Sequence, residues 1–288
     1  MRAWLVAALS LAGSSTSASG QADHTPVPKR VTLRICPRIG DTLRMRYDQQ
    51  VDMTGVRPST PGGGGAGQGS THDSTVTRTT TLLVLSRAIV ENADTTGTEL
   101  LAVTDSVAIG TTGSSAPQSG DVIRRLLGNQ VRVRIARDGA TSLVDSAGVS
   151  PELHAVFAQM PATLPREAIP IGHAWDRTMT VPVRGGGRGG AALTSTFRLD
   201  SLSHDGNSAY ISMHGTLRHD AAHDPADAMR VSVTGTVTGT MIVDRRRGWL
   251  TDSHAVIAVN SVFAPPTGDS SPPTLVHMTV TQWLRTVN

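Results

Sequence analysis

Hydrophobic and polar residues alternate along most of the chain that follows residue 40. In the run Arg230–Asp244 the valines and Met241 fall on one side, and the threonines fall on the other. The run Thr42–Met53 alternates in the same way. A period of two residues is typical of a strand with one buried face, and a row of threonines suits the solvated face. The pattern therefore predicts an antiparallel sheet with one wet face.

Turn residues divide the remaining alternating runs into hairpins. Because the spacing of β-α-β units is absent, the fold class is expected to be mainly β: a large curved antiparallel sheet, or open half-barrel, of about a dozen strands with one short helix. The turns are centred on Asp138-Gly139, Asp205-Gly206-Asn207 and Arg247-Gly248. The further strands are expected at Val31–Ile35, Thr75–Val90, Glu99–Ile109, Val131–Val144 (both arms of one hairpin), Phe197–Leu202, Ala209–Leu217, Trp249–Val262 and Thr274–Leu284.

One expected strand carries an acidic residue within its apolar side. In Glu99–Ile109, the residues Leu101, Val103, Val107 and Ile109 are expected to share a face that Asp105 interrupts. In Arg230–Asp244, two glycines lie on the apolar side, where they are expected to let the strand bend sharply.

A strand opening occurs twice. Gly40–Asp48 follows Ile39, and a loosely similar Gly172–Thr180 follows Ile171. Each copy is followed by two hairpins, and the chain is therefore expected to form one β-rich domain at 21–288 from pseudo-repeats at about 31–146 and 171–286. Asp105-Ser106 of the first copy is matched to Asp200-Ser201 of the second.

One short helix and a single turn of helix are predicted between the strands. Residues 150–160 begin with a serine cap and a proline at the first helical position, and they carry an apolar stripe that includes Phe157. This helix and the proline-rich residues up to 170 link the two pseudo-repeats. A turn of helix is also expected from Asp121 to Leu127, closed by Gly128. Glycine-rich loops are expected at 58–73 and 185–190.

The first 20 residues have the three zones of a signal peptide: a positive end, an apolar stretch and a small polar cleavage region. The apolar stretch is shorter than the roughly 20 residues that a membrane-spanning helix needs. Ser14 occupies the place of the acylated cysteine in a lipoprotein box. The protein is therefore expected to be exported, periplasmic or extracellular, soluble and not lipid-anchored; a cytosolic protein with an apolar start is the alternative.

Composition narrows the function classes. Cys36 is the single cysteine, so an internal disulfide is excluded. The formal net charge is +3 and aromatic residues make up 3% of the chain, with arginines scattered rather than clustered. Nucleic acid is therefore not an expected partner, because base stacking needs aromatic platforms and phosphate binding needs a basic patch. The sequence also predicts no cofactor.

Residues that could carry chemistry are few. His219 and His223 have the i, i+4 spacing of a zinc pair on a helix, but they lie in a polar stretch with Pro225 and without further clear ligands. A solvated loop is the favoured interpretation. The chain lacks a Gly-x-Ser-x-Gly nucleophile motif. We expect a protein that is not an enzyme, and a hydrolase or a metal-binding protein that uses His219 and His223 remains an alternative.

Methionines recur within the expected strands, mostly on the apolar side. Methionine is flexible and polarizable, so it suits both a surface for variable apolar ligands and an ordinary core. The first interpretation predicts a secreted binding or envelope-associated protein that carries or senses an apolar, lipid-like molecule, with an envelope protein as a second candidate partner. The alternative is an interaction domain with a filled core. The candidate ligand-lining residues are Met45, Met179, Met213, Met241, Met278, Phe157 and Trp175.

The Ile-Gly strand opening, the Asp138-Gly139 hairpin before the proline-rich link, and the stretch Gly239–Leu250 resemble a family of uncharacterised secreted bacterial proteins. The resemblance covers Val31 to Thr286 and is more specific in the second half. It implies a secreted β-rich fold and assigns no functional residue. The order of strands and helix is also similar to the half-open barrel of periplasmic lipoprotein carriers.

Overall fold

The computed structural model describes residues 30–57, 74–113, 120, 123–124, 127–145, 163–181, 190–220, 229–266, 268 and 271–287. The expected signal peptide at 1–20, the expected helix at 150–160 and the glycine loop at 58–73 lie outside these residues. The described residues form eleven strands. They are β1 (Thr42–Arg57), β2 (Ser74–Ala93), β3 (Gly97–Thr112), β4 (Gln130–Ala136), β5 (Thr141–Leu143), β6 (Ala174–Val181), β7 (Ala191–Leu202), β8 (Ser208–His219), β9 (Arg230–Asp244), β10 (Trp249–Ala264) and β11 (Thr274–Val287).

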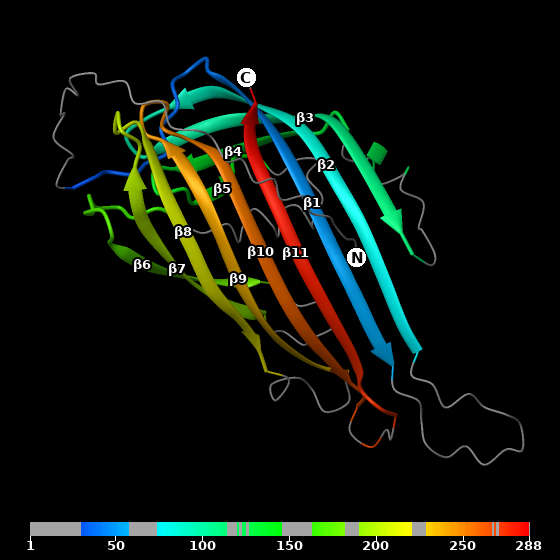
Figure 1. Ribbon diagram of the computed structural model, residues 1–288. Helices are drawn as coiled ribbons and strands as arrows, with labels where there is room; N and C mark the ends of the chain where they lie inside the picture. The colour runs from blue at the N-terminus through cyan, green and yellow to red at the C-terminus, as the bar shows by residue number, and fades with distance from the viewer. Residues whose placement is uncertain are drawn as a thin grey trace, which may run out of the picture.

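All eleven strands belong to one sheet, in the order β5-β4-β3-β2-β1-β11-β10-β9-β8-β7-β6. Strands β1 to β5 form one meander and β6 to β11 form another, and the antiparallel pairing of β1 with β11 joins them. Figure 1 shows the long strands β1, β2, β10 and β11 running side by side through the middle of the sheet. The sheet is open because β5 and β6 remain at its two edges. The expected open, curved, antiparallel all-β fold is confirmed.

The two faces of the sheet differ as the alternation predicts. On β9 the valines at 231, 233, 237 and 243 are buried, whereas the threonines at 234, 236, 238 and 240 are exposed. We call the valine side the inner face and the threonine side the outer face. Trp175 and Trp249 are both buried, at 8% and 5% exposed.

Two irregular segments cross one end of the sheet, which we call the bridged end. Val31 and Ile169 form an isolated bridge, and the amide of Ile35 donates to the carbonyl of Arg137 in the β4–β5 turn. The amide of Cys36 donates to the carbonyl of Gly248 in the β9–β10 turn, 2.8 Å away. The strand expected at Val31–Ile35 is therefore wrong: its backbone groups bond to turns from distant parts of the chain rather than to a neighbouring strand.

The segments at 31–36 and 163–169, here the bridging segments, carry the central part of the core. Val31, Leu33 and Leu164 are almost fully buried, and they belong to one cluster with side chains from both halves of the sheet. Burial of these side chains holds the curled ends of the sheet together where backbone pairing between β5 and β6 is missing. The cluster comprises Val31, Leu33, Ile35, Leu43, Ala88, Val90, Leu100, Val133, Leu164, Ile169, Trp175, Phe197, Leu199, Ala209, Ile211, Met241, Val243 and Trp249.

The two copies of the Ile-Gly motif form the same turn. Gly40 and Gly172 have φ values of 87° and 84°, a backbone conformation that glycine adopts without steric cost. The amide of Gly40 donates to the carbonyl of Val90, whose own amide donates to the carbonyl of Asp41. In the second copy, the amide of Gly172 donates to the carbonyl of Leu199, whose own amide donates to the carbonyl of His173. The motif therefore anchors β1 to the end of β2 in the same way as it anchors β6 to the end of β7.

This equivalence corrects the matching of acidic residues between the copies. The register shifts at Glu91, between Val90 and Asn92, and at Asp200, between Leu199 and Ser201, so each acid lies in a β-bulge directly after the residue that anchors the Ile-Gly turn. Asp200 therefore corresponds to Glu91 and not to Asp105. Superposition of the complete pseudo-repeats remains a prediction.

Asp105 lies in a bulge of its own, which reverses the faces of β3. Leu85 pairs with Ser106 and Ser86 pairs with Thr104, so Asp105 is the extra residue. Before the bulge, Val103 lies opposite Arg87 on the outer face; after it, Val107 lies opposite Val84 on the inner face. The expectation that the apolar residues at 101, 103, 107 and 109 share one face is therefore wrong, because an inserted residue shifts the alternation by one.

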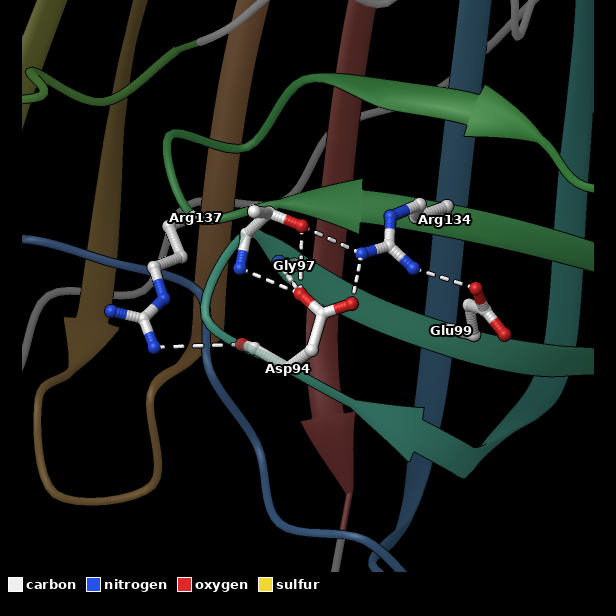
Figure 2. A network of polar contacts seen from close by, with 6 residues as sticks. Asp94, Gly97, Glu99, Arg134 and Arg137 are labelled. Atoms are coloured by element: carbon white, nitrogen blue, oxygen red, sulfur yellow. Dashed lines mark hydrogen bonds and ion pairs between the residues drawn. The ribbon is translucent and has the colours of Figure 1, made fainter.

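Hydrogen bonds from side chains fix the turn between β2 and β3 (Figure 2). The Asp94 carboxylate accepts the amide of Thr96 at 2.6 Å and the amide of Gly97 at 3.0 Å. Arg134 of β4 donates both to this carboxylate and to Glu99, at 2.6 Å from the latter. Hydrogen bonds from Arg134 and from Thr96 lower the pKa of Asp94 well below its ordinary value. The network ties the hairpin to its neighbouring strand.

The short helical segment expected before β4 is confirmed in its described residues. Gly120, Ile123 and Arg124 are helical, and the amide of Leu127 donates to the carbonyl of Ile123. Gly128 has a φ of 74°, as expected for a glycine that ends a helix.

Candidate functional site

The apolar inner face continues beyond the core, toward the end of the sheet opposite the bridging segments. Val51 of β1 and Val280 of β11 lie opposite each other there and are buried. Ile257 and Met278 pack against them and are only half-buried. This region, which we call the trough, consists of Val51, Ala191, Leu193, Leu217, Val231, Val233, Ile257, Val259, Phe263, Met278 and Val280.

The trough is formed by residues that are distant in the sequence. The register of β1, β11, β10 and β9 places apolar residues on the inner face in successive strands, as in the row Val51, Val280, Ile257 and Val237. Among the described residues, the extensive backbone contacts between strands all join neighbours in the sheet. This arrangement can bind an apolar molecule by removing its surface from water.

Polar side chains interrupt the inner face between the core and the trough. Gln49 of β1 pairs in register with Gln282 of β11, and Tyr47 lies two residues before Gln49. Burial raises the pKa of Tyr47, so its phenol stays neutral through the physiological range. This polar cluster, Tyr47, Gln49 and Gln282, offers uncharged donors and acceptors at the end of an apolar surface. Its sequence signal is Gln49, a polar residue on the apolar side of the alternation in Thr42–Met53.

The methionines proposed to line a ligand do not form one site. Met241 is 9% exposed and belongs to the core at the bridged end, against which Met45 and Met213 pack while partly buried. Met278 lies in the trough, and Met179 is half-buried on β6. The alternation identified their face, but their positions along the strands divide them between the core and the trough.

The two aromatic candidates also differ. Trp175 stacks on Phe197 with ring centroids 5.8 Å apart, and its indole nitrogen donates to the carbonyl of Thr163 at 2.8 Å. Trp175 therefore joins β6 to the second bridging segment. Phe157 lies outside the described residues.

Two large cavities lined by described residues lie at the bridged end and not in the trough. One, of about 750 Å³, includes Arg38, Asp205 and Arg246, and the other, of about 700 Å³, includes Arg166 and His173. Charged and polar side chains dominate both linings. An apolar ligand site that includes Phe157 of the helix expected at 150–160 remains a prediction, because those residues lie outside the described part of the chain.

The described residues do not bring together a group of three or more His, Cys, Asp or Glu side chains that could hold a metal ion. His219 is half-buried at the end of β8, and His223 lies outside the described residues. Among the described helical residues, none forms a helix that is long and apolar enough to cross a membrane.

The outer face carries an aromatic cluster. His254 of β10 stacks on Trp283 of β11 with ring centroids 4.7 Å apart, and the Arg285 guanidinium lies 5.3 Å from the centre of the indole. Burial, together with the charge of Arg285, lowers the pKa of His254 despite the opposing effect of Asp252. His254 is therefore expected to be neutral at physiological pH.

The fold and the trough define an open-sheet β protein with an apolar inner face. A family profile described as a family of unknown function (DUF6263) matches residues 150–250, about a third of the chain. This region includes the second bridging segment, β6 to β9 and the start of β10. The resemblance to a family of uncharacterised proteins is thus confirmed for residues 150–250. The comparison with curated proteins gave no match.

Among solved structures, the chain is similar to one described as "lipid-protein interactions in lipovitellin", with 10% sequence identity and a TM-score of 0.49. The similarity covers 87% of this chain and 25% of that chain, so the protein spans about a quarter of the other's length. The expected envelope-protein partner gains no support from these comparisons.

Proposed function

We propose that this is an exported, non-catalytic protein that carries or senses an apolar, lipid-like molecule in the trough. The observation that carries the proposal is the extension of the apolar inner face past the core, with side chains such as Ile257 and Met278 only half-buried. Partly exposed apolar side chains that lie next to one another on one face can mark a site for an apolar ligand.

The energy available from such a surface is sufficient for a useful affinity. Each methylene group removed from water contributes about 0.8 kcal/mol, so a ten-carbon segment of an acyl chain would contribute about 8 kcal/mol before entropic costs. Association and ordering cost several kcal/mol, which leaves a moderate net affinity. Half-buried Met278 and Phe263 can adjust their rotamers to chains of different shape, as methionine does particularly well.

The polar cluster supports a ligand with an uncharged polar group at one end. Tyr47 can donate a hydrogen bond because its phenol is neutral, and the amides of Gln49 and Gln282 can each donate and accept. None of these three side chains carries a charge that would favour an ionised head group. A neutral lipid, an ester or a hydroxylated apolar molecule matches this chemistry.

The alternative is an interaction domain whose interior is filled by its own side chains. The packing of Met241 in the core, with Met45 and Met213 against it, favours that interpretation for the bridged end. A charge at Met241 would therefore test folding rather than binding. Met278 is the better probe because it is half-buried and lies in the trough.

Native mass spectrometry of the protein purified from its own host tests the proposal. Wild-type protein is expected to retain a co-purified apolar molecule, identified after organic extraction, and Met278→Asp is expected to lose it because a carboxylate would face the bound chain. Thr279→Asp is the matched control, since the next residue along β11 faces the outer side. A ligand-free wild type, or equal occupancy in both variants, would favour the filled interior.

Export has a separate test. N-terminal mass spectrometry of the protein from fractionated cells is expected to find chains that begin near residue 20 outside the cytoplasm. An intact Met1 in the cytosolic fraction would refute export without bearing on the trough.

A further inference from the structure

A small pocket lies on the outer face of β1, β2, β3 and β11, on the opposite side of the sheet from the trough. Its volume is about 130 Å³. Gln50 lies between Thr81 and Thr281 in the register, and two residues away Asp48 lies between Leu83 and Trp283. These six residues define what we call the outer-face pocket.

Gln50 is the unexpected member of this pocket. It lies on the side of β1 that the alternation assigns to solvent, yet it is only 3% exposed. Its amide nitrogen donates to Asp52 at 2.9 Å. Because a carboxylate only accepts hydrogen bonds, this contact fixes the orientation of the amide.

This orientation leaves the side-chain amide oxygen of Gln50, Oε1, pointing away from Asp52. Within the described residues this buried oxygen has no hydrogen-bond partner. Asp52 lies toward the far end of β1 and outside the pocket, whereas Asp48 and Trp283 lie on the other side of Gln50 and line it. Gln50 itself is among the residues that line the pocket. A buried acceptor without a donor is costly, so the site favours a molecule that brings a donor.

The other pocket residues restrict the class of that molecule. Arg46 binds both oxygens of the Asp48 carboxylate at 2.7 Å, so the charge of Asp48 is already compensated and a cation is not specifically favoured. Thr81 and Thr281 provide hydroxyl groups, and Leu83 and Trp283 provide apolar surface. His254 and Arg285 hold the indole of Trp283 in place.

We propose that the outer-face pocket is a saccharide-binding subsite. A sugar ring presents hydroxyl donors on its edge and C–H groups on its faces, and both kinds of surface have partners here. In this arrangement a sugar hydroxyl donates to the Gln50 carbonyl oxygen, the hydroxyls of Thr81 and Thr281 bind neighbouring oxygens, and C–H groups contact Leu83 and Trp283. The volume is of the order of one sugar ring, or about four water molecules at roughly 30 Å³ each. The subsite does not depend on the proposed function of the trough.

The test is a titration of the full chain with neutral monosaccharides and disaccharides, followed by NMR of the tryptophan indole N–H signals and by calorimetry. The signal of Trp283 is expected to shift, whereas those of Trp175 and Trp249 are not, because both are buried in the core on the other side of the sheet. Gln50→Met removes the unpaired acceptor while keeping the chain length, and it is expected to weaken binding about tenfold, the equivalent of losing one hydrogen bond.

Thr81→Val and Thr238→Val form a matched pair, since both threonines are exposed on the outer face and only Thr81 lines the pocket. Thr81→Val is expected to weaken binding about threefold to tenfold, and Thr238→Val by less than about twofold. This pair also keeps the test valid if Gln50→Met folds poorly. Absence of binding by every sugar, or binding that neither Gln50→Met nor Thr81→Val weakens, would refute the subsite and leave water as its occupant.

Discussion

Removal of the Trp175 side chain tests whether the core at the bridged end holds the open sheet together. The indole is 8% exposed, stacks on Phe197 and donates to the carbonyl of Thr163. Truncation of a buried tryptophan to alanine costs about 3–5 kcal/mol. Within this loss the ring stacking accounts for about 0.5–1.5 kcal/mol and the hydrogen bond for about 1 kcal/mol.

Trp175→Phe separates these contributions, because it keeps an aromatic ring against Phe197 and removes the indole N–H. We expect it to cost about 1–2 kcal/mol, from the lost hydrogen bond and the smaller buried surface. Urea unfolding followed by far-UV circular dichroism measures both variants without relying on tryptophan emission. For a chain of this size, Trp175→Ala should lower Tm by about 10 °C, at roughly 2–4 °C per kcal/mol.

Tyr210→Ala is the control, since Tyr210 lies on the outer face and is 39% exposed. It should cost less than about 1 kcal/mol, as surface substitutions usually do. If Trp175→Ala costs no more than this control, or if Trp175→Phe costs as much as Trp175→Ala, the proposed role of Trp175 in joining β6 to the bridging segment is incorrect.

Two further predictions concern the sheet and its turns. A Cβ atom at Gly235 would lie 2.5 Å from the carbonyl oxygen of Ala258, whereas a Cβ atom at Gly55 would meet nothing within 4 Å. Gly235→Ala should therefore lower the free energy of unfolding by about 1–3 kcal/mol, as measured by chemical unfolding. Gly55→Ala should leave it unchanged or raise it by about 0.5 kcal/mol. Equal effects would refute the conclusion that the neighbouring strand leaves no space for a side chain at Gly235. Because hydrogen bonds from Arg134 lower the pKa of Asp94, the stability from its carboxylate should be complete above about pH 4 and lost as the pH falls further. The Tm of Asp94→Asn should therefore fall less steeply than the Tm of the wild type between about pH 4 and 2. An identical slope would contradict a stabilising role of the Asp94 carboxylate.

Much of the sheet could be predicted from the sequence because the alternation of side chains is a local property. The valine and threonine rows of β9 follow directly from it, and the turns at Gly139, Gly206 and Gly248 follow from the turn residues between the alternating runs. The bulge at Asp105 could not be predicted, since one extra residue in β3 is defined only by its pairing with β2. The bridging segment at 31–36 looks like a strand by composition, but its hydrogen-bond partners lie in turns far along the chain.

The candidate site was predictable only in part, because alternation identifies a face and not a position along it. Met241 and Met278 occupy the same face, yet one packs in the core and the other lies in the trough. Burial of Gln50 had no local signal at all. Gln50 lies between Thr81 of β2 and Thr281 of β11, so its burial depends on strands that are distant from it in the sequence.

Photocrosslinking of a bound apolar ligand tests the central claim most directly. The full chain is incubated with an acyl-chain probe that carries a diazirine in its tail, irradiated, digested and mapped by mass spectrometry. We expect the modified residues to lie on the inner face of β10 and β11, at Ile257, Phe263 or Met278, and to disappear when an unlabelled acyl chain competes. Crosslinks confined to the outer face, or crosslinks that resist competition, would contradict the assignment of the trough as the ligand site.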